Sequence, residues 1–250
     1  MPTALSTDLY ELTMAAGHFG ADTNRSATFE LSVRGLPPGR GYLLAAGIEP
    51  ALTYLEELRF TAPEIDYLRQ IPQLRRVPSS FFDDYLPGFR FTGDVWGMAE
   101  GEPVFANEPL LRVTAPLVEA QVVETALLST VLFQTSVASR ASRMVRAAAG
   151  RPVFELGARR AHGAEAGALA GRAAFVGGCS GTSDLEAGLA FGVPLAGTMA
   201  HSWVMSHDSE TESFVRFIEM YGEQTVLLID TYDTGRAVDR QSPRRALALS

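Results

Sequence analysis

The chain has 250 residues, of which 46% are hydrophobic and 20% are charged, enough apolar material for one large core or two smaller ones. Its net charge of -8 argues against a general nucleic-acid binder, because affinity for a phosphate backbone comes from clustered positive charge. All 21 basic residues are arginines, and the lack of lysine excludes Schiff-base catalysis and the lysine of a P-loop.

The N-terminal third of the chain is predicted to mix short helices with a strand. The first residues contain neither a basic segment nor an apolar one, so nothing directs the chain to secretion, and we expect a cytoplasmic protein. Residues 8–19 place apolar side chains at helical spacing behind capping residues, and residues 28–34 alternate as a strand. Further short helices are expected near residues 50–58, 63–71 and 79–86.

The middle of the chain is predicted to contain a sheet and then a long helix. Residues 90–114 are β-rich, and their glycines and prolines favour an antiparallel or edge-forming sheet. A long helix is expected from residue 117 to about residue 148. Charged and amide side chains interrupt this apolar stretch, which a bilayer core would reject, so we expect no membrane span.

After residue 150, short apolar segments alternate with helical ones, a βα pattern that predicts parallel strands joined by crossover helices. The expected strands are residues 153–156, 174–177, 193–197 and 225–230, and the expected helices lie near 165–171, 183–191 and 209–221. Each helix is short enough for a barrel unit, and four βα units make half of an eight-stranded barrel.

The predicted fold class is therefore α/β. An N-terminal α+β domain (1–115) is followed by a connecting helix (116–150) and by part of an irregular TIM-like β/α barrel (151–236). Residues 237–250 show no clear period, which predicts a disordered tail or the product of a truncation. The single cysteine, Cys179, cannot form an internal disulfide, which agrees with a reducing compartment.

In βα folds the functional residues lie at the carboxyl ends of the strands. After the first predicted strand, Arg159 and Arg160 lie in a glycine-flanked loop able to bind a phosphate or carboxylate, although such pairs are more often plain surface charge. At the second, the glycines of residues 176–185 let backbone amides approach a ligand, and the helix beginning near Ser183 points its positive end at an anion. A turn capped by Thr182 or Ser183 is the alternative.

The two later strand ends carry a histidine and a carboxylate. His201 follows the third predicted strand, where an isolated histidine is usually structural. Asp230 ends the fourth, where it could accept a hydrogen bond from one ring nitrogen of His201 and leave the other free as a nucleophile. An acidic strand end can also cap the next helix, and the spacing leaves both interpretations open.

Five motifs follow one another along nearly the whole chain. They are Thr7-Asp8-Leu9-Tyr10-Glu11-Leu12-Thr13-Met14, Gly157-Ala158-Arg159-Arg160-Ala161-His162-Gly163, Gly178-Cys179-Ser180-Gly181-Thr182-Ser183, Gly197-Thr198-Met199-Ala200-His201-Ser202 and Ile229-Asp230-Thr231-Tyr232-Asp233-Thr234. Together they resemble nicotinate phosphoribosyltransferases. The resemblance implies a type II phosphoribosyltransferase fold that makes nicotinate mononucleotide, a precursor of NAD, from nicotinate and phosphoribosyl pyrophosphate. It also implies coupled ATP hydrolysis through a phosphohistidine, with Mg²⁺ bound only alongside the phosphates.

The resemblance also implies roles for individual residues. His201 matches the phosphorylated histidine, and Asp230 would orient its ring. Arg159 and Arg160 match a loop that contacts pyridine and phosphate groups. Tyr10 matches a stacking aromatic that the neighbouring subunit supplies, so the site would need at least a homodimer.

The bend at Gly181, Thr182 and Ser183 is expected to bind the substrate, and Ser183 sets its specificity. Similar enzymes that act on nicotinamide carry Asp there, which would repel the carboxylate of nicotinate, so Ser favours the acid. Two positions depart from the family. Leu156 replaces a Phe that would stack on the pyridine, and Asp184 replaces an Asn, adding a negative charge or complementing a helix dipole.

The family's chains continue past residue 234 with further barrel strands and phosphate-binding loops. A complete chain of 250 residues would therefore be inactive alone and would expose barrel edges. One alternative is a noncatalytic remnant that binds pyridine acids or pairs with a complementary polypeptide. The other is a Rossmann-like phosphoribosyltransferase built on residues 226–235, whose acids are normally adjacent, whereas Asp230 and Asp233 are separated.

Overall fold

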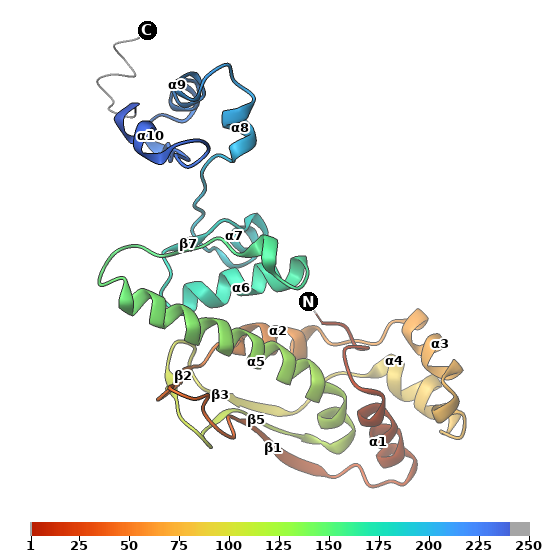
Figure 1. Ribbon diagram of the computed structural model, residues 1–250. Coiled ribbons are helices and arrows are strands. Elements are labelled where there is room, and N and C mark those ends of the chain that lie inside the picture. The colour runs from red at the N-terminus through yellow and green to blue at the C-terminus, as the bar shows by residue number, and fades with distance from the viewer. Residues whose placement is uncertain (1, 241–250) are drawn as a thin grey trace. The chain divides into compact units, whose positions relative to one another are not determined.

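The computed structural model describes residues 2–240 of the chain, which form two compact units (Figure 1). The first unit ends at Pro194 and the second begins at Leu195. The predicted boundaries at residues 115 and 150 both lie inside the first unit, so the division into 1–115, 116–150 and 151–236 stays a prediction. Of the expected tail, residues 237–240 belong to helix α10, and residues 241–250 lie outside the described residues.

The first unit contains a three-stranded antiparallel sheet in the order β1-β5-β3. Its strands are β1 (Ser26–Ser32), β5 (Pro109–Pro116) and β3 (Asp94–Gly97). Val113 and Ala115 of β5 are buried while Arg112 between Leu111 and Val113 is exposed, because successive side chains of a strand point to opposite faces. A second antiparallel pair joins β2 (Leu43–Leu44) to β4 (Pro103–Val104). The predicted antiparallel region is confirmed.

The helices expected before residue 150 are also present. They are α1 (Leu9–Gly20), α2 (Ile48–Glu57), α3 (Ala62–Gln70), the π-helical turn Phe81–Tyr85 with α4 (Leu86–Gly88), and α5 (Leu117–Ala147). A short 3-10 turn, Pro72–Leu74, follows α3. The helix predicted at residues 79–86 forms as the π-helical turn and α4, because Pro87 has no N–H with which to continue the α-helical bonding.

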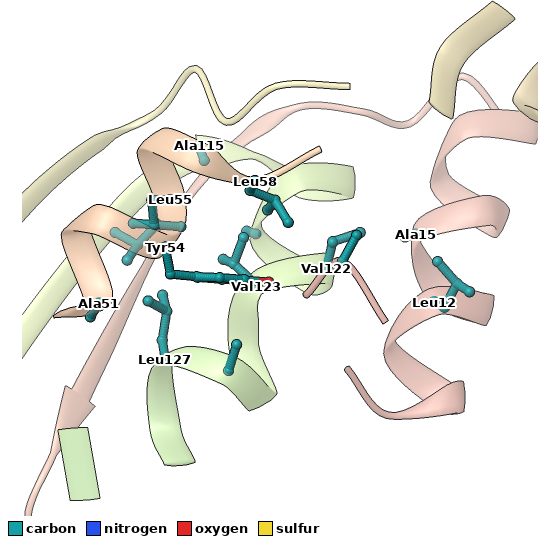
Figure 2. Packing of buried hydrophobic residues seen from close by; sticks show 14 of the residues in the cluster. Leu12, Ala15, Ala51, Tyr54, Leu55, Leu58, Ala115, Val122, Val123 and Leu127 are labelled. Atoms are coloured by element: carbon teal, nitrogen blue, oxygen red, sulfur yellow. The ribbon is translucent and has the colours of Figure 1, made fainter. Parts of the chain in front are cut away.

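Helix α5 forms the centre of the first unit's core, where it packs against α1, α2 and the sheet (Figures 1 and 2). The side chains that meet there include Leu12, Ala15, Ala51, Tyr54, Leu55, Leu58, Ala115, Val122, Val123 and Leu127. Among the described residues, α5 alone is long and apolar enough to cross a membrane by those two criteria. However, 56% of its most apolar stretch is buried inside the protein, as in the core helix of a globular domain.

The rest of the first unit is one parallel β-α-β unit followed by a helix. Strand β6 (Phe154–Glu155) pairs with β7 (Gly181–Thr182), and α6 (Ala164–Val176) connects them before α7 (Leu185–Phe191). The strand predicted at residues 174–177 is wrong, because those residues end α6. The alanine-rich sequence continues the helix up to Gly177, and Gly178, at φ 94°, turns the chain into β7.

The second unit consists of α8 (His201–Met205), α9 (Glu210–Tyr221) and α10 (Thr234–Arg240), with a small core that includes Val204 and Phe214. The strands predicted at residues 193–197 and 225–230 are wrong in this structure, apart from an isolated bridge at Leu195. Leu227, Leu228 and Ile229 pack against the small core instead. Strands need a neighbour to share their hydrogen bonds. Residues 225–230 have none in the described part of this unit, whereas at the first segment only the carbonyl of Pro194 accepts a hydrogen bond from the N–H of Thr182 in β7, at 2.9 Å. The fold class, α/β, is confirmed.

Candidate functional site

The parallel pairing of β6 and β7 brings two of the predicted corners together. Glu155 pairs with Thr182, and the backbone N–H of Ser183 donates to the carbonyl of Glu155 at 3.0 Å. The 3-10 turn Ala158–Arg160 follows β6 and packs against α6. The arginine loop and the bend at residues 181–183 are therefore neighbours at the carboxyl edge of one small parallel sheet.

Solvent reaches some of these side chains and not others. Arg159, Arg160 and Ser183 are exposed, so a dissolved ligand could contact them. Gly181 and Thr182 are buried. A Cβ on Gly181 would lie 2.3 Å from the carbonyl oxygen of Pro194, so packing alone requires a glycine there. In this bend, Ser183 is therefore exposed to solvent while the two residues before it are buried.

Asp184 caps α7, a role that the sequence assigned to Thr182 or Ser183. Its Oδ1 accepts a hydrogen bond from the N–H of Ala187 at 2.8 Å. The N–H of Asp184 donates in turn to Thr182 Oγ1 at 3.2 Å. The carboxylate at this position therefore serves the start of the helix, which is one of the two interpretations of its departure from Asn.

Leu156, which stands where the resemblance implies a stacking ring, is accessible. Leu156 directly follows β6 and is 50% exposed. An aliphatic side chain there offers a pyridine ring a hydrophobic contact but no aromatic face.

Tyr10 lies in the first turn of α1 and is 56% exposed. Its hydroxyl donates to Glu11 Oε1 at 3.2 Å. Glu11 is itself buried and accepts hydrogen bonds from the hydroxyls of Thr7 (2.7 Å) and Thr125 (2.6 Å). The charge of Glu11, followed by partial burial and the charge of Glu124, raises the pKa of Tyr10. The accessible ring of Tyr10 is thus hydrogen-bonded to the buried carboxylate of Glu11.

His201 and Asp230 belong to the second unit. The ring of His201 is exposed at the start of α8, and its Nδ1 lies 3.2 Å from Thr231 Oγ1. The fourth corner therefore does approach the histidine, through the hydroxyl of Thr231. Asp230 is exposed, and its orienting role stays a prediction.

Sequence reasoning missed Thr231 and Glu155. Thr231 lies inside the Asp-Thr-Tyr-Asp-Thr motif, where the carboxylates drew attention first. Glu155 is an acid between Phe154 and Leu156 in an otherwise apolar strand, immediately before the glycine of the arginine loop. That position is the signal that could have revealed it, because a carboxylate rarely lies in a strand without a polar partner.

Comparisons with known sequences point to one family. Residues 5–132, just over half of the chain, match the family described as nicotinate phosphoribosyltransferase (NAPRTase) N-terminal domain. Nicotinate phosphoribosyltransferase pncB2 of Mycobacterium tuberculosis is 47% identical over 236 residues, which cover 94% of this chain and 50% of that protein. The Bacillus subtilis nicotinate phosphoribosyltransferase is 42% identical over 238 residues, covering 94% and 47%. The chain thus spans about half the length of these curated relatives.

Comparisons with solved structures agree. The crystal structure of human nicotinic acid phosphoribosyltransferase superposes with a TM-score of 0.72 at 36% identity, covering 80% of this chain and 40% of that one. The nicotinate-nucleotide pyrophosphorylase from Pyrococcus furiosus, at 23% identity and a TM-score of 0.74, covers 92% and 51% and shows the fold alone. The fold and the paired strand ends thus define a protein of the type II phosphoribosyltransferase class. Within that class, the chain belongs to the nicotinate phosphoribosyltransferase family.

Proposed function

We propose that this chain carries the pyridine-binding part of a nicotinate phosphoribosyltransferase. The reaction joins nicotinate to phosphoribosyl pyrophosphate and gives nicotinate mononucleotide and pyrophosphate. The pairing of β6 with β7 supports the proposal, because the segment with Arg159 and Arg160 and the segment with Ser183 follow paired strands at one edge in a member of this family. Guanidinium groups bind carboxylates and phosphates through paired N–H donors, which suits both substrates.

Ser183 is the proposed determinant of base specificity. Its exposed hydroxyl can donate a hydrogen bond to the carboxylate of nicotinate, and it adds no charge of its own. An Asp at this position would repel the acid and accept from the amide of nicotinamide. The neighbouring Asp184 caps α7 through Ala187, which ties its charge to the helix start.

Tyr10 is the proposed aromatic partner of the pyridine ring, contributed to the site of a second subunit in a homodimer. Its ring is accessible to another molecule, and the bond to Glu11 restricts where the ring can lie. Stacking between Tyr and a heteroaromatic ring contributes about 1 kcal/mol beyond simple burial.

His201 is the proposed acceptor of the γ-phosphate of ATP. The reaction is proposed to take place in the cytoplasm. A neutral ring nitrogen forms a bond to phosphorus, the bond to the bridging oxygen breaks, and ADP leaves with that electron pair. Thr231 would orient the ring, and Asp230 would stabilise its positive charge. Among residues 2–240 there is no group of three or more His, Cys, Asp or Glu side chains that could hold a metal. Mg²⁺ is proposed to enter with the phosphates, which supply oxygen ligands of the kind that it prefers.

The Rossmann-like alternative receives no support from the structure. The chain belongs instead to the nicotinate phosphoribosyltransferase family. The solved structures at high similarity also have the type II fold.

The proposal is tested by incubating the purified chain with ATP labelled in the γ-phosphate and Mg²⁺, then adding nicotinate and phosphoribosyl pyrophosphate. Acid-labile phosphate on His201 and formation of nicotinate mononucleotide are expected. The variant H201A should lose the label. The control H207A should keep it, since His207 Nδ1 lies 2.7 Å from the carbonyl of Trp203 and serves α8. Label that persists in H201A contradicts the role of that residue. Nicotinate binding without turnover would favour the noncatalytic alternative.

A further inference from the structure

Glu155 forms hydrogen bonds to both corners of the candidate site. Its Oε2 accepts a hydrogen bond from the hydroxyl of Thr182 at 2.8 Å, in the bend that leads to Ser183. Its Oε1 accepts from the backbone N–H of Gly157, the first residue of the arginine loop. One carboxylate therefore links the two segments that follow β6 and β7.

Two glycines, Gly157 and Gly171, leave the space that the side chains of Glu155 and Thr182 occupy. A Cβ on Gly157 would lie 2.7 Å from Glu155 Oε1, too close for a real contact, so a side chain there would displace the carboxylate. On the other side, a Cβ on Gly171 of α6 would lie 3.1 Å from Thr182 Oγ1 and 3.0 Å from Ala187 Cβ. The absence of both side chains allows the pair to pack between the strand ends and α6.

The hydrogen bonds continue on both sides of Ser183. Thr182 Oγ1 also accepts from the N–H of Asp184 at 3.2 Å, and the N–H of Ser183 donates to the backbone carbonyl of Glu155 at 3.0 Å. The residue before Ser183, the residue itself and the residue after it are thus all bonded to Glu155 or Thr182. Such a network restricts the position of the exposed Ser183 side chain relative to the arginine loop.

Thr182 is fully buried and uses its polar groups inside the protein. Its hydroxyl bonds to Glu155, and its N–H donates to the carbonyl of Pro194 at 2.9 Å. We infer that Glu155 and Thr182 are positioning residues that fix Ser183 against Arg159 and Arg160 for a pyridine carboxylate. This inference rests on the proposed function of the same corner. Binding to a prearranged site is stronger because less order is lost on binding.

The test compares two substitutions of one side chain. Thr182→Val keeps the volume but removes the hydroxyl, whereas Thr182→Ser keeps the hydroxyl. By NMR, Thr182→Val should shift the amide signal of Gly157, which Thr182 reaches through Glu155, and Thr182→Ser should restore it. By calorimetry, nicotinate affinity should fall about tenfold in Thr182→Val and by no more than about twofold in Thr182→Ser.

A matched control separates positioning from general stability. Thr135 is also buried, and its hydroxyl bonds to the backbone N–H and carbonyl of Ala46, outside the candidate site. Thr135→Val should leave the Gly157 signal and nicotinate affinity unchanged. An unshifted Gly157 amide in Thr182→Val, or an equal loss of affinity in Thr182→Ser, would overturn the inference. If the unmodified chain binds no nicotinate, the proposed function fails, and the NMR comparison still decides whether Glu155 couples the corners.

Discussion

Arg172 of α6 forms a bidentate ion pair with Glu100, which lies between β3 and β4. Nη1 donates to Oε1 at 3.1 Å and Nη2 donates to Oε2 at 2.7 Å. Arg172 also donates to Gln134 of α5 at 3.2 Å and to Glu49 of α2 at 2.5 Å. The guanidinium side chain is only 6% exposed. The buried guanidinium of Arg172 thus connects α6, which packs beside the candidate site, to the antiparallel part of the first unit.

Replacing Arg172 by Met should destabilise the first unit by about 3 kcal/mol, because Glu100 would remain largely buried without its partner. Arg112→Met is the control. Arg112 pairs with Glu30 at 2.6 Å, but both side chains are about half exposed, so its loss should cost less than about 1 kcal/mol. Urea unfolding measures both. Equal losses would show that the Arg172 cluster contributes no more than a surface pair.

The ion pair of Arg172 and Glu100 also predicts that the free energy of unfolding depends on pH. Burial acts to raise the pKa of Glu100, but the hydrogen bonds and charge of Arg172 and the N–H groups of Ile48 and Glu49 outweigh it, so the pKa lies below its ordinary value of 4.5. A carboxyl with a lowered pKa in the folded state stabilises the protein above its unfolded pKa, and the stabilisation is lost as the pH falls through the folded pKa. The free energy of unfolding should therefore fall as the pH drops below the ordinary value of 4.5 and through the lower pKa of the folded state. Urea unfolding at several pH values should show a shallower fall in Arg172→Met, and parallel curves would contradict the assignment.

Tyr54 carries a buried hydroxyl for which the described residues provide no hydrogen-bond partner. Figure 2 shows its side chain extending from α2 toward Val123 of α5. Tyr54→Phe should stabilise the protein by about 1 kcal/mol, since it removes a polar group that lost its water on folding. Tyr67→Phe, at a residue 57% exposed, should change stability by less than about 0.5 kcal/mol. Thermal unfolding measures the stability of the two variants. A destabilised Tyr54→Phe would show that the Tyr54 hydroxyl has a hydrogen-bond partner.

Gly47 precedes α2 at φ 87° and lies directly against α5. A Cβ there would be 2.7 Å from the carbonyl oxygen of Thr130. Gly39 also has a positive φ, 74°, but a Cβ there would meet nothing within 4 Å. Gly39→Ala should therefore cost about 1 kcal/mol from backbone strain alone, and Gly47→Ala should cost a further 1–3 kcal/mol, roughly, from overpacking. Chemical unfolding should show that difference, and similar costs would mean that α5 can move aside.

Local sequence patterns predicted the first unit well because its elements are determined locally. Residues 8–19 combine an apolar face with a capping box at Asp8 and Glu11, and α1 forms there. The long helix after residue 117 and the alternating strands before it are equally evident in the sequence. The segment at residues 174–177 failed because four apolar residues fit a strand or a buried helix, and the alanines before them continued α6.

The strands expected in the second unit failed for a different reason. Residues 225–230 are apolar enough for a buried parallel strand, but such a strand forms only where neighbouring strands accept its hydrogen bonds. Sequence patterns do not show whether that neighbour is present. The candidate site divides in the same way. The exposed groups of Arg159, Arg160 and Ser183 could be identified in sequence, whereas the Glu155 network depends on tertiary pairing.

The binding of pyridine acids tests the central claim most directly. Isothermal titration of the purified chain with nicotinate and with nicotinamide should show tighter binding of the acid, and Ser183→Asp should reverse that preference by introducing a charge that repels the carboxylate. If the chain binds both bases equally, or if Ser183→Asp leaves the preference for nicotinate unchanged, the strand edge of β6 and β7 does not recognise the pyridine carboxylate.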